Sequence, residues 1–461
     1  MNTVSVLQSF CLAFIITPFL SRFQYQAYAS ALAGFILLML WFRPRRRLQC
    51  LHDGWVAPGF EKVAEAFRYN VKSGHEMGGA FAVYYRGQQV VDLWGGYMDL
   101  AIRRPWHKDT LAMFFSSTKA VTAVVIGMLV DRGLLNYEKP VCYYWPEFGR
   151  NGKEEITVEQ LLSHQSGLVN PNEKYQLSLI KDNPEELSRI LADDKPKWTP
   201  GQGQGYHALT YGLYACQLVQ RVDPKGRNLS QFFKDEVADP FGIDFYIGLP
   251  KSENYRCARL GSGKFGLRNF LKEYIPAGLE FVTNVTRIFI GTKRNLLWQF
   301  RRNPTDWRSR KLNNPDFREL PVGSSHGFGT ATSLAKLFGI TANGGSMGDK
   351  TLLSKNTIKK LNTALTSRMD RVIMRRVTFG PGTIIEGPPE NNKLVGPVFG
   401  HFGVGGQAAF CDPYFKVSWA YCTNYLNVVH GYRDDHRYSK LRDALYDCVR
   451  ALDQTPLAAS I

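Results

Sequence analysis

The sequence predicts an α+β fold, an α/β sandwich in which both ends of the chain build one antiparallel sheet and a mainly helical domain is inserted between them. Strand patterns lie near both ends and helical patterns fill the middle: strands over Phe81–Tyr85, Gln88–Trp94, Phe399–Cys411 and Lys416–Thr423, and helices over Lys119–Val222. A sheet buries its apolar faces against another layer, so we expect helices to flank it.

Composition narrows the class of protein. The chain has 461 residues, 44% apolar and 13% aromatic, which suits a large core and excludes a collagen, a disulfide-rich miniprotein and a polar disordered chain. The net charge of +17 suits contact with nucleic acid or anionic lipid. No helix-turn-helix, RRM or finger pattern accompanies it, so we expect no nucleic-acid partner. The eight cysteines show no C-x-x-C pair and no metal spacing, so we expect free thiols, no metal and no other cofactor.

The first fifty residues are predicted to anchor the chain in a membrane. Met1–Ser21 has no charged side chain, and a second uncharged stretch covers Phe23–Phe42. Each is close to the ~20 residues that a membrane-spanning helix needs, and the basic segment Arg43–Arg47 stops the second one. We therefore expect residues 1–50 to form a single-pass anchor or a short hairpin in a membrane of the endomembrane system.

Cleavage and topology stay open for this segment. Small residues around Ala29 suit a cleaved signal peptide, although no Lys or Arg precedes the first apolar run. The arginine cluster favours a cytosolic domain, whereas Asn228 and Asn284 begin sequons that are used only in the lumen.

Residues 51–461 are predicted as one catalytic domain. Phe60–Asn70 reads as an amphipathic helix, the N-terminal hairpin ends at Gly95-Gly96, and Lys440–Leu452 has the period of a closing helix. Residues 264–311 form a basic, apolar insertion with eleven Lys or Arg and three acidic residues. Such a segment either packs on its own domain or lies on a bilayer surface.

An S-x-x-K motif supplies the candidate nucleophile. Ser116 stands at the expected N-cap of an apolar helical run, and Lys119 lies one turn on, on the same face. This spacing aims the lysine amine at the serine oxygen, and an amine whose pKa is lowered by burial can take the serine proton. Helix capping alone also explains the motif.

Four further blocks follow in order: Ile156–Leu168, Trp198–Gly201 with Gly205–Ala208, Ala342–Gly345, and Gly400–Gly406. The complete set resembles the serine β-lactamase and penicillin-binding-protein superfamily, within it the β-lactamase-like esterases, and is similar to eukaryotic membrane-anchored β-lactamase-domain proteins. The resemblance covers His52 to Leu452 and implies the β-lactamase/transpeptidase-like fold.

The resemblance also implies roles for matching residues. Ser116 would be the acylated nucleophile, Lys119 its activating partner, and Tyr206, in the family's Y-x-N block, the proton shuttle. His164 matches a structural helix end, and a capping box is expected at the start of that helix, at Thr157.

The last block would bind substrate. His401 and Gly403 stand where lactamases carry K-T-G, and the backbone N–H groups of Ser116 and Val404 would form the oxyanion hole. Ala208 departs from the family's Asn, and His401 replaces a fixed positive charge by an imidazole that is mostly neutral at pH 7. Both departures favour a small acyl ester or amide, lipid-like or not, over a β-lactam.

These observations predict a membrane-anchored serine hydrolase with an acyl-serine intermediate, a carboxylesterase or transacylase rather than a true β-lactamase. The alternative is a catalytically inactive, membrane-tethered binding or scaffold protein, which the missing Asn at Ala208 would suit. Gly323–Gly327 also fits the G-x-S-x-G nucleophile elbow around Ser325. Residues Asn314–Pro321 are too polar and proline-rich for the buried strand that an elbow needs before its serine.

Overall fold

The computed structural model of the protein describes residues 30–32, 34–35, 50–261, 303–307, 309–387, 397–426 and 435–454. The predicted anchor therefore lies outside the described residues, apart from a few helical residues at 30–35 and Cys50. Most of the basic insertion 264–311 and the Asn284 sequon also lie outside them. Among the described residues, no helix has the length and apolar character needed to cross a membrane.

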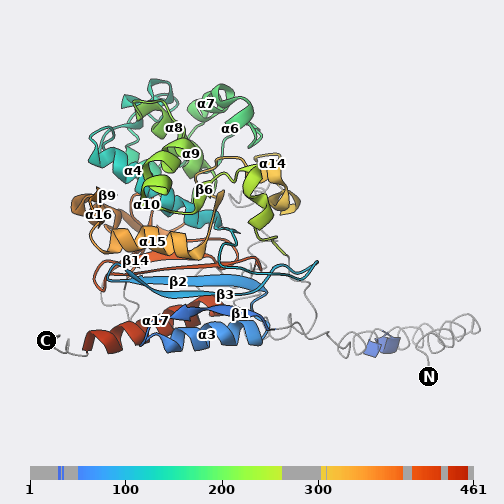
Figure 1. Cartoon of the computed structure of the whole chain (residues 1–461). Coiled ribbons are helices and arrows are strands. Elements are labelled where there is room, and N and C mark those ends of the chain that lie inside the picture. The colour runs from blue at the N-terminus through green and yellow to red at the C-terminus, as the bar shows by residue number, and fades with distance from the viewer. Residues whose placement is uncertain are drawn as a thin grey trace, which may run out of the picture. The chain divides into compact units, whose positions relative to one another are not determined.

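A long antiparallel sheet lies at the centre of the unit formed by Cys50–Gly263 and Thr283–Ile461 (Figure 1). From edge to edge its strands are β1 (His52–Val56), β3 (Gln88–Asp99), β2 (Gly78–Tyr85), β15 (Val417–Thr423), β14 (Ala408–Asp412), β13 (Val398–Phe402), β12 (Ile384–Glu386), β11 (Arg376–Phe379) and β10 (Thr366–Met369), with β4 (Arg104–Pro105) paired to β3. The two ends of the chain meet where β2 pairs with β15, with Phe81 opposite Tyr421. The predicted sheet from both chain ends is confirmed.

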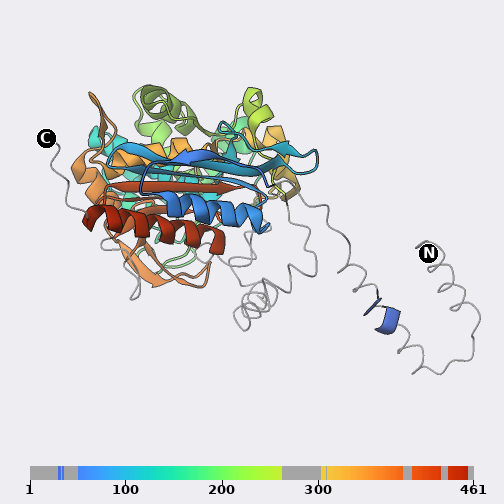
Figure 2. The same cartoon turned by 60° about the horizontal axis from the view of Figure 1, so that its bottom comes forward.

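Side chains of the central strands alternate between two cores. Three helices cover the sheet: α3 (Glu61–Lys72) and α17 (His436–Gln454) on one face, and α15 (Ala331–Ala342) on the other (Figures 1 and 2). On β15, Trp419 and Tyr421 pack in the core with α3 and α17, whereas Ala420 and Cys422 pack in the opposite core. This is the two-residue period of a strand that is buried on both faces. Helices predicted at Phe60–Asn70 and Lys440–Leu452 are confirmed as α3 and α17.

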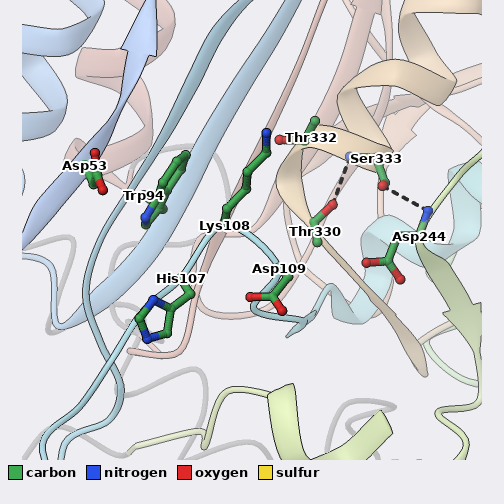
Figure 3. Close-up of a pocket in the computed structure, with 9 residues that line it drawn as sticks. All are labelled: Asp53, Trp94, His107, Lys108, Asp109, Asp244, Thr330, Thr332 and Ser333. Atoms are coloured by element: carbon green, nitrogen blue, oxygen red, sulfur yellow. Dashed lines mark hydrogen bonds between the residues drawn. The ribbon is translucent and has the colours of Figure 1, made fainter.

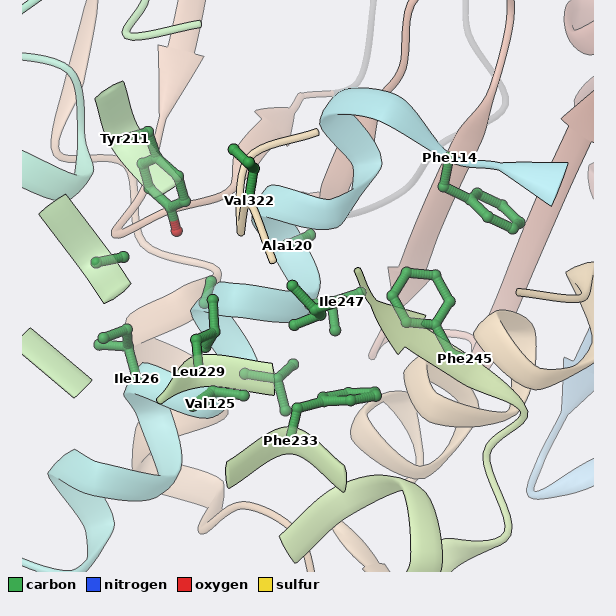
Figure 4. Packing of buried hydrophobic residues seen from close by; sticks show 14 of the residues in the cluster. Phe114, Ala120, Val125, Ile126, Tyr211, Leu229, Phe233, Phe245, Ile247 and Val322 are labelled. Carbon is green, nitrogen blue, oxygen red and sulfur yellow. The ribbon is translucent and has the colours of Figure 1, made fainter. Parts of the chain in front are cut away.

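The helical layer holds the centre of the second core. Its helices are α4 (Thr118–Asp131), α5 (Val158–Leu162), α6 (Leu179–Asp182), α7 (Pro184–Asp193), α8 (Thr210–Val222), α9 (Leu229–Phe233), α10 (Asp239–Phe241), α14 (Pro315–Arg318) and α16 (Lys355–Leu361). Short strands complete it: β5 (Ala112–Met113), β7 (Gly327–Gly329), β6 (Phe245–Ile247), β8 (Ser346–Met347) and β9 (Lys350–Thr351). Every α4 residue from Thr118 to Leu129 is buried, and Figure 4 shows apolar side chains around it. A helix that is apolar on all sides belongs in a core.

Two predicted strand boundaries are wrong. The predicted strand Phe399–Cys411 is two paired strands, β13 and β14, because Gly405 and Gly406 adopt φ values of +94° and +112° and turn the chain back. The predicted hairpin end at Gly95-Gly96 is too early, since β3 continues to Asp99. A Cβ on Gly95 would lie 2.7 Å from the carbonyl oxygen of Leu51, so this glycine permits the close approach of the chain at β1.

Candidate active site

The candidate nucleophile lies in a tight turn just before the buried helix. Phe115 to Ser117 form a single 3₁₀ turn, and Phe115 has a φ of +47°, which is uncommon for a bulky residue. The turn is tied on two sides: Phe114 N donates to Gly327 O (2.8 Å), and Ser117 Oγ donates to His401 O (2.9 Å). Strain of this kind persists only where the surroundings enforce it, and it concentrates at functional sites.

The expectation that Ser116 caps the helix is wrong. The 3₁₀ turn moves the start of α4 to Thr118, and Ser117, at the N-cap position, makes no side-chain capping bond. The Ser116 hydroxyl is therefore available to Lys119, whose Nζ lies 3.4 Å from Ser116 Oγ. The side chains are buried at this point, with Ser116 9% and Lys119 0% exposed.

The Lys119 amine has carbonyl partners and no carboxylate. Its Nζ donates to Ala208 O (2.8 Å) and Ser324 O (3.0 Å), and among the described residues it forms no ion pair. Burial lowers the pKa of Lys119 well below its usual value, because the charged form loses its hydration. In the neutral amine, two N–H groups serve these carbonyls and the lone pair is left for the Ser116 hydroxyl.

Tyr206 lies on the other side of this amine. Its ring centroid is 4.6 Å from Lys119 Nζ, and its ring packs against those of Phe379 and His401. Tyr206 N donates to Asp370 Oδ1 (3.1 Å), which also accepts from Val372 N (2.9 Å). Asp370 therefore fixes the backbone that carries Tyr206.

Two buried histidines, His164 and His207, fix the backbone next to Tyr206. His207 Nδ1 donates to Gly205 O (2.7 Å), and its Nε2 accepts from Leu168 N (3.1 Å). His164 Nδ1 accepts from His207 N (3.1 Å), and its ring packs 5.0 Å from that of Tyr206. Burial lowers the pKa of both rings, that of His207 to about 3. These contacts fit the supporting role predicted for His164, and the capping box at Thr157 is confirmed.

His401 lies on β13 facing Tyr206. Its Nδ1 is 2.6 Å from Phe402 O, so this nitrogen carries the proton and donates. Nε2 is then an acceptor, and it is buried without a hydrogen-bond partner among the described residues. Burial, together with the neighbouring Lys119 amine, lowers the pKa of His401 to about 3. The ring is neutral at pH 7, as predicted, and its pKa lies far below that of a free imidazole.

Gly403 and Val404 begin the loop after β13, which packs against the nucleophile turn. A Cβ on Gly403 would lie 2.3 Å from Phe114 O, so only glycine permits this approach. Gly403 N donates to Gln407 O (2.7 Å), and the Gln407 side chain donates to Met113 O (3.1 Å). The loop that carries Val404 is thus fastened to the strand that leads to Ser116.

A buried ion cluster, which the sequence analysis missed, contacts the other side of this loop. Arg437, 1% exposed, donates to Gly405 O (2.8 Å) and pairs with Asp435 (2.6 Å). Glu76 lies 3.7 Å from the same guanidinium and accepts from the hydroxyls of Tyr421 and Thr423. No sequence motif marks this cluster, because Glu76 stands more than 350 positions before Asp435 and Arg437.

A cavity of about 420 Å³ opens beside Tyr206 and His401. Its wall is mainly apolar, with polar side chains as well: Tyr206, Ile373, Arg375, Arg376, Val377, Thr378, Phe379, Ile384, Ile385, Glu386, Gly387, His401 and Phe402. A second cavity, of about 540 Å³, is lined by Asp53, Trp94, His107, Lys108 and residues of the α15 N-terminus, and none of the predicted site residues lines it (Figure 3). The cavity at Tyr206 is the candidate substrate cavity, because two of the predicted site residues, Tyr206 and His401, line it.

No metal-binding group of three or more His, Cys, Asp or Glu side chains occurs within the described part of the chain. The chemistry available at the site is that of a serine hydroxyl beside a desolvated amine. Such a pair can form and cleave an acyl-serine ester without any bound group.

Comparison with known proteins identifies the family of this chain. The family model described as "Beta-lactamase" matches residues 63–443. This chain belongs to the β-lactamase family. It is 33% identical over 384 residues to "Esterase/beta-lactamase LipL" of Mycobacterium tuberculosis (strain ATCC 25618 / H37Rv), a match that covers 81% of this chain and 83% of the relative.

Solved structures agree with this membership. The fold is similar to that of a family VIII carboxylesterase, with a TM-score of 0.73 and 33% identity, and to a penicillin-binding protein homolog from Caulobacter crescentus, with a TM-score of 0.71 and 32% identity. Each covers 86% of this chain and 99% of the other. The chain is thus a serine hydrolase in the esterase branch of the superfamily.

Ser325, the alternative nucleophile, is not preceded by the buried strand that a nucleophile elbow needs. The residues before it form helix α14 and a loop, as the prolines predicted, and Ser325 Oγ contacts the neighbouring His326 Nδ1 (2.9 Å). Ser324 takes part in the site only through its backbone carbonyl, which accepts from Lys119.

Proposed function

We propose that this enzyme hydrolyses neutral carboxylic esters through an acyl intermediate on Ser116. The observation that carries the proposal is the Lys119 amine, buried without a carboxylate partner among the described residues and 3.4 Å from Ser116 Oγ. A lysine can act as a base near neutral pH only if its pKa is lowered in this way.

In the acylation step, Lys119 takes the Ser116 proton while Oγ bonds to the ester carbonyl carbon. The backbone N–H groups of Ser116 and Val404 stabilise the oxyanion, which is the electrostatic contribution that usually matters most. The intermediate collapses, the bond to the alcohol oxygen breaks, and Tyr206 gives its hydroxyl proton to that oxygen and takes the proton held by Lys119 in its place. Water then attacks the acyl-serine, with the same residues moving its proton, and Ser116 is restored. An acceptor alcohol in place of water would make the reaction a transacylation.

The preference for neutral esters rests on two side chains. His401 carries no charge at pH 7 and offers an acceptor, so it cannot hold a substrate carboxylate as a fixed cation would. Ala208 supplies only its backbone carbonyl, which is already bonded to Lys119, and no side-chain amide for a lactam. The words "esterase" and "carboxylesterase" in the names of the relatives support the same substrate class. No feature of the site favours the inactive scaffold alternative.

Residues 1–50 would tether this domain to a membrane of the endomembrane system. The support is the sequence alone: two uncharged stretches and the basic segment Arg43–Arg47. The tether would keep the site close to membrane-dissolved esters, and the sequence leaves the side of the membrane open.

Parallel hydrolysis assays test the proposed activity. The purified full chain is given a series of neutral p-nitrophenyl esters and a chromogenic β-lactam, with Ser116→Ala as the blank. We expect ester turnover above the blank and kcat/KM for the lactam at least about 100-fold lower, because a missing polar partner costs roughly 3 kcal/mol in a buried site. Lactam turnover equal to ester turnover would refute the proposed selectivity.

A further inference from the structure

The β10–β11 hairpin, residues 366–379, borders the candidate substrate cavity. Ile373 in its turn and residues Arg375–Phe379 line that cavity together with Tyr206 and His401. The hairpin forms the free edge of the sheet, because β10 is the last strand in the order. A surface on this hairpin would therefore lie beside the entrance to the site.

Three arginines of the hairpin keep an uncompensated charge. Arg368 donates to Gly201 O (2.8 Å), Arg371 lies over the Trp198 ring (5.1 Å), and Arg376 donates to Ser367 O (2.9 Å). All three are exposed, and within the described residues none of them pairs with a carboxylate. The acidic residue of the hairpin, Asp370, is fully buried and accepts from backbone N–H groups.

Two large apolar side chains stand exposed among these arginines. Met369 is 58% exposed and Met374 is 46% exposed, on the two sides of the turn. Arginines on an edge strand can serve simply to prevent pairing with another strand. That purpose does not call for exposed methionines, whereas basic residues interleaved with apolar ones are typical of segments that lie in a lipid interface.

The hairpin is joined rigidly to the catalytic segment. The Gln204 side chain donates to Val377 O (3.1 Å) and accepts from Thr366 Oγ1 (3.0 Å). Asp370 accepts from Tyr206 N, so the hairpin turn and the candidate proton shuttle share one hydrogen-bond network. Contact at the hairpin would thus hold the cavity at a fixed distance from whatever surface it touches.

We propose that the β10–β11 hairpin docks on an anionic lipid surface, with Met369 and Met374 entering the apolar layer and Arg368, Arg371 and Arg376 facing lipid phosphates. The arginines supply electrostatic attraction and the methionines supply apolar contact, which are the two contributions that interfacial segments combine. Docking of this hairpin would orient the cavity toward esters dissolved in the membrane. The proposed function supplies only the reason for the docking. The docking itself can be tested without measuring ester hydrolysis.

A reporter on the hairpin tests the docking in the full chain. Met374→Cys is labelled with an environment-sensitive fluorophore in a chain that carries Cys11→Ser, Cys50→Ser and Cys142→Ser, because Cys50 and Cys142 are free thiols that are not buried. Ile102→Cys gives the matched control, because Ile102 is 71% exposed, is followed by Arg103 and Arg104, and lies near the opposite edge of the sheet. Emission is recorded with phosphatidylcholine vesicles, with and without phosphatidylserine, and thermal melting checks that each variant is folded.

We expect the label at position 374 to shift to shorter wavelength only with the phosphatidylserine vesicles, and the shift to fade as salt rises. Arg368→Gln with Arg371→Gln should weaken the partition about 30-fold, because each basic residue near such a surface contributes about fivefold. Met369→Gln should weaken it as well.

Three results would overturn the docking. They are no shift at position 374, an equal shift at position 102, and an equal shift with soluble polyglutamate, which would indicate an acidic protein partner. If ester turnover fails in the assays above but the label still shifts, the proposed reaction is wrong and the docking stands.

Discussion

Lys119 is the residue on which the proposed chemistry depends, because its amine is placed in the core without an opposite charge among the described residues. Its partners are two backbone carbonyls and the Ser116 hydroxyl. Water is excluded, so the neutral form of the amine is favoured and a base is created from a side chain that is ordinarily an acid at pH 7. A surface lysine at the same spacing in the sequence would not be able to do this.

The ionisation of Lys119 should therefore determine how kcat/KM decreases at low pH. Its pKa lies well below 10.5 in the folded protein, so the amine is neutral above that lowered pKa, and activity is lost as pH falls through it. Rates measured with a neutral ester from pH 5 to 9 should decrease toward acid. Lys119→Arg, which stays charged, should be nearly inactive throughout this range, and substantial activity in that variant would rule out the base role.

Lys119 and Tyr206 should act as one unit with Ser116. Lys119→Met and Tyr206→Phe are each expected to remove most of kcat, and the double variant should lose little more, because residues that move the same proton are not additive. Single-turnover rates of the four proteins measure this. Losses that multiply would show two independent roles and contradict the shared proton path.

His401 should give no charge-based selection between pH 5 and pH 8. With a pKa of about 3 the ring stays neutral from pH 5 to 8. The ratio of kcat/KM for a neutral ester to that for its carboxylate-bearing analogue should then be constant over this range. A preference for the carboxylate that grows below pH 7 would mean that the imidazole becomes charged at the site.

At the scale of elements, the loop between β13 and β14 is positioned by charges far from it in sequence. Arg437 reaches Gly405 O from the start of α17, while Glu76 and Asp435 neutralise the guanidinium. A Cβ on Gly406 would lie 2.6 Å from Asp435 Oδ2, so the loop and the cluster are in close contact. The oxyanion donor proposed at Val404 thus depends on a buried ionic network.

Arg437→Gln should lower the free energy of unfolding by about 3–5 kcal/mol, because it leaves two buried carboxylates without their counter-charge. Urea denaturation measures the change. Arg86→Gln is the matched control: the Arg86–Asp453 pair is about half exposed, and its loss should cost no more than about 1 kcal/mol. Equal effects of the two variants would show that the cluster contributes no more than a surface pair.

At the scale of the whole molecule, the sequence predicts the elements with strong periodicity and the site residues that lie close together along the chain. The continuous apolar run of β2 and the period of α17 are local signals, and the three-residue spacing brings Ser116, in the turn before α4, close to Lys119 in its first turn. The hairpin end and the single strand Phe399–Cys411 were predicted wrongly. At these places glycines allow a sharp turn or a close approach to another segment, which a side chain would prevent.

The supports of the site could not be read from the sequence. Asp370 and Arg437 reach it from segments that have no motif, and their role depends on which backbone groups the fold brings to them. Short strands such as β10 to β12 exist because a neighbouring strand pairs with them, and their own patterns are weak. Tertiary contact determines these features.

Covalent labelling with a serine-reactive probe shows whether Ser116 is the nucleophile. The full chain is treated with a fluorophosphonate, digested, and analysed by mass spectrometry, beside Ser116→Ala and Ser325→Ala. We expect one adduct, on the peptide that contains Ser116, in the wild type and in Ser325→Ala, and none in Ser116→Ala. A folded wild type without an adduct, or an adduct that disappears only in Ser325→Ala, would contradict the assignment of Ser116 as the nucleophile.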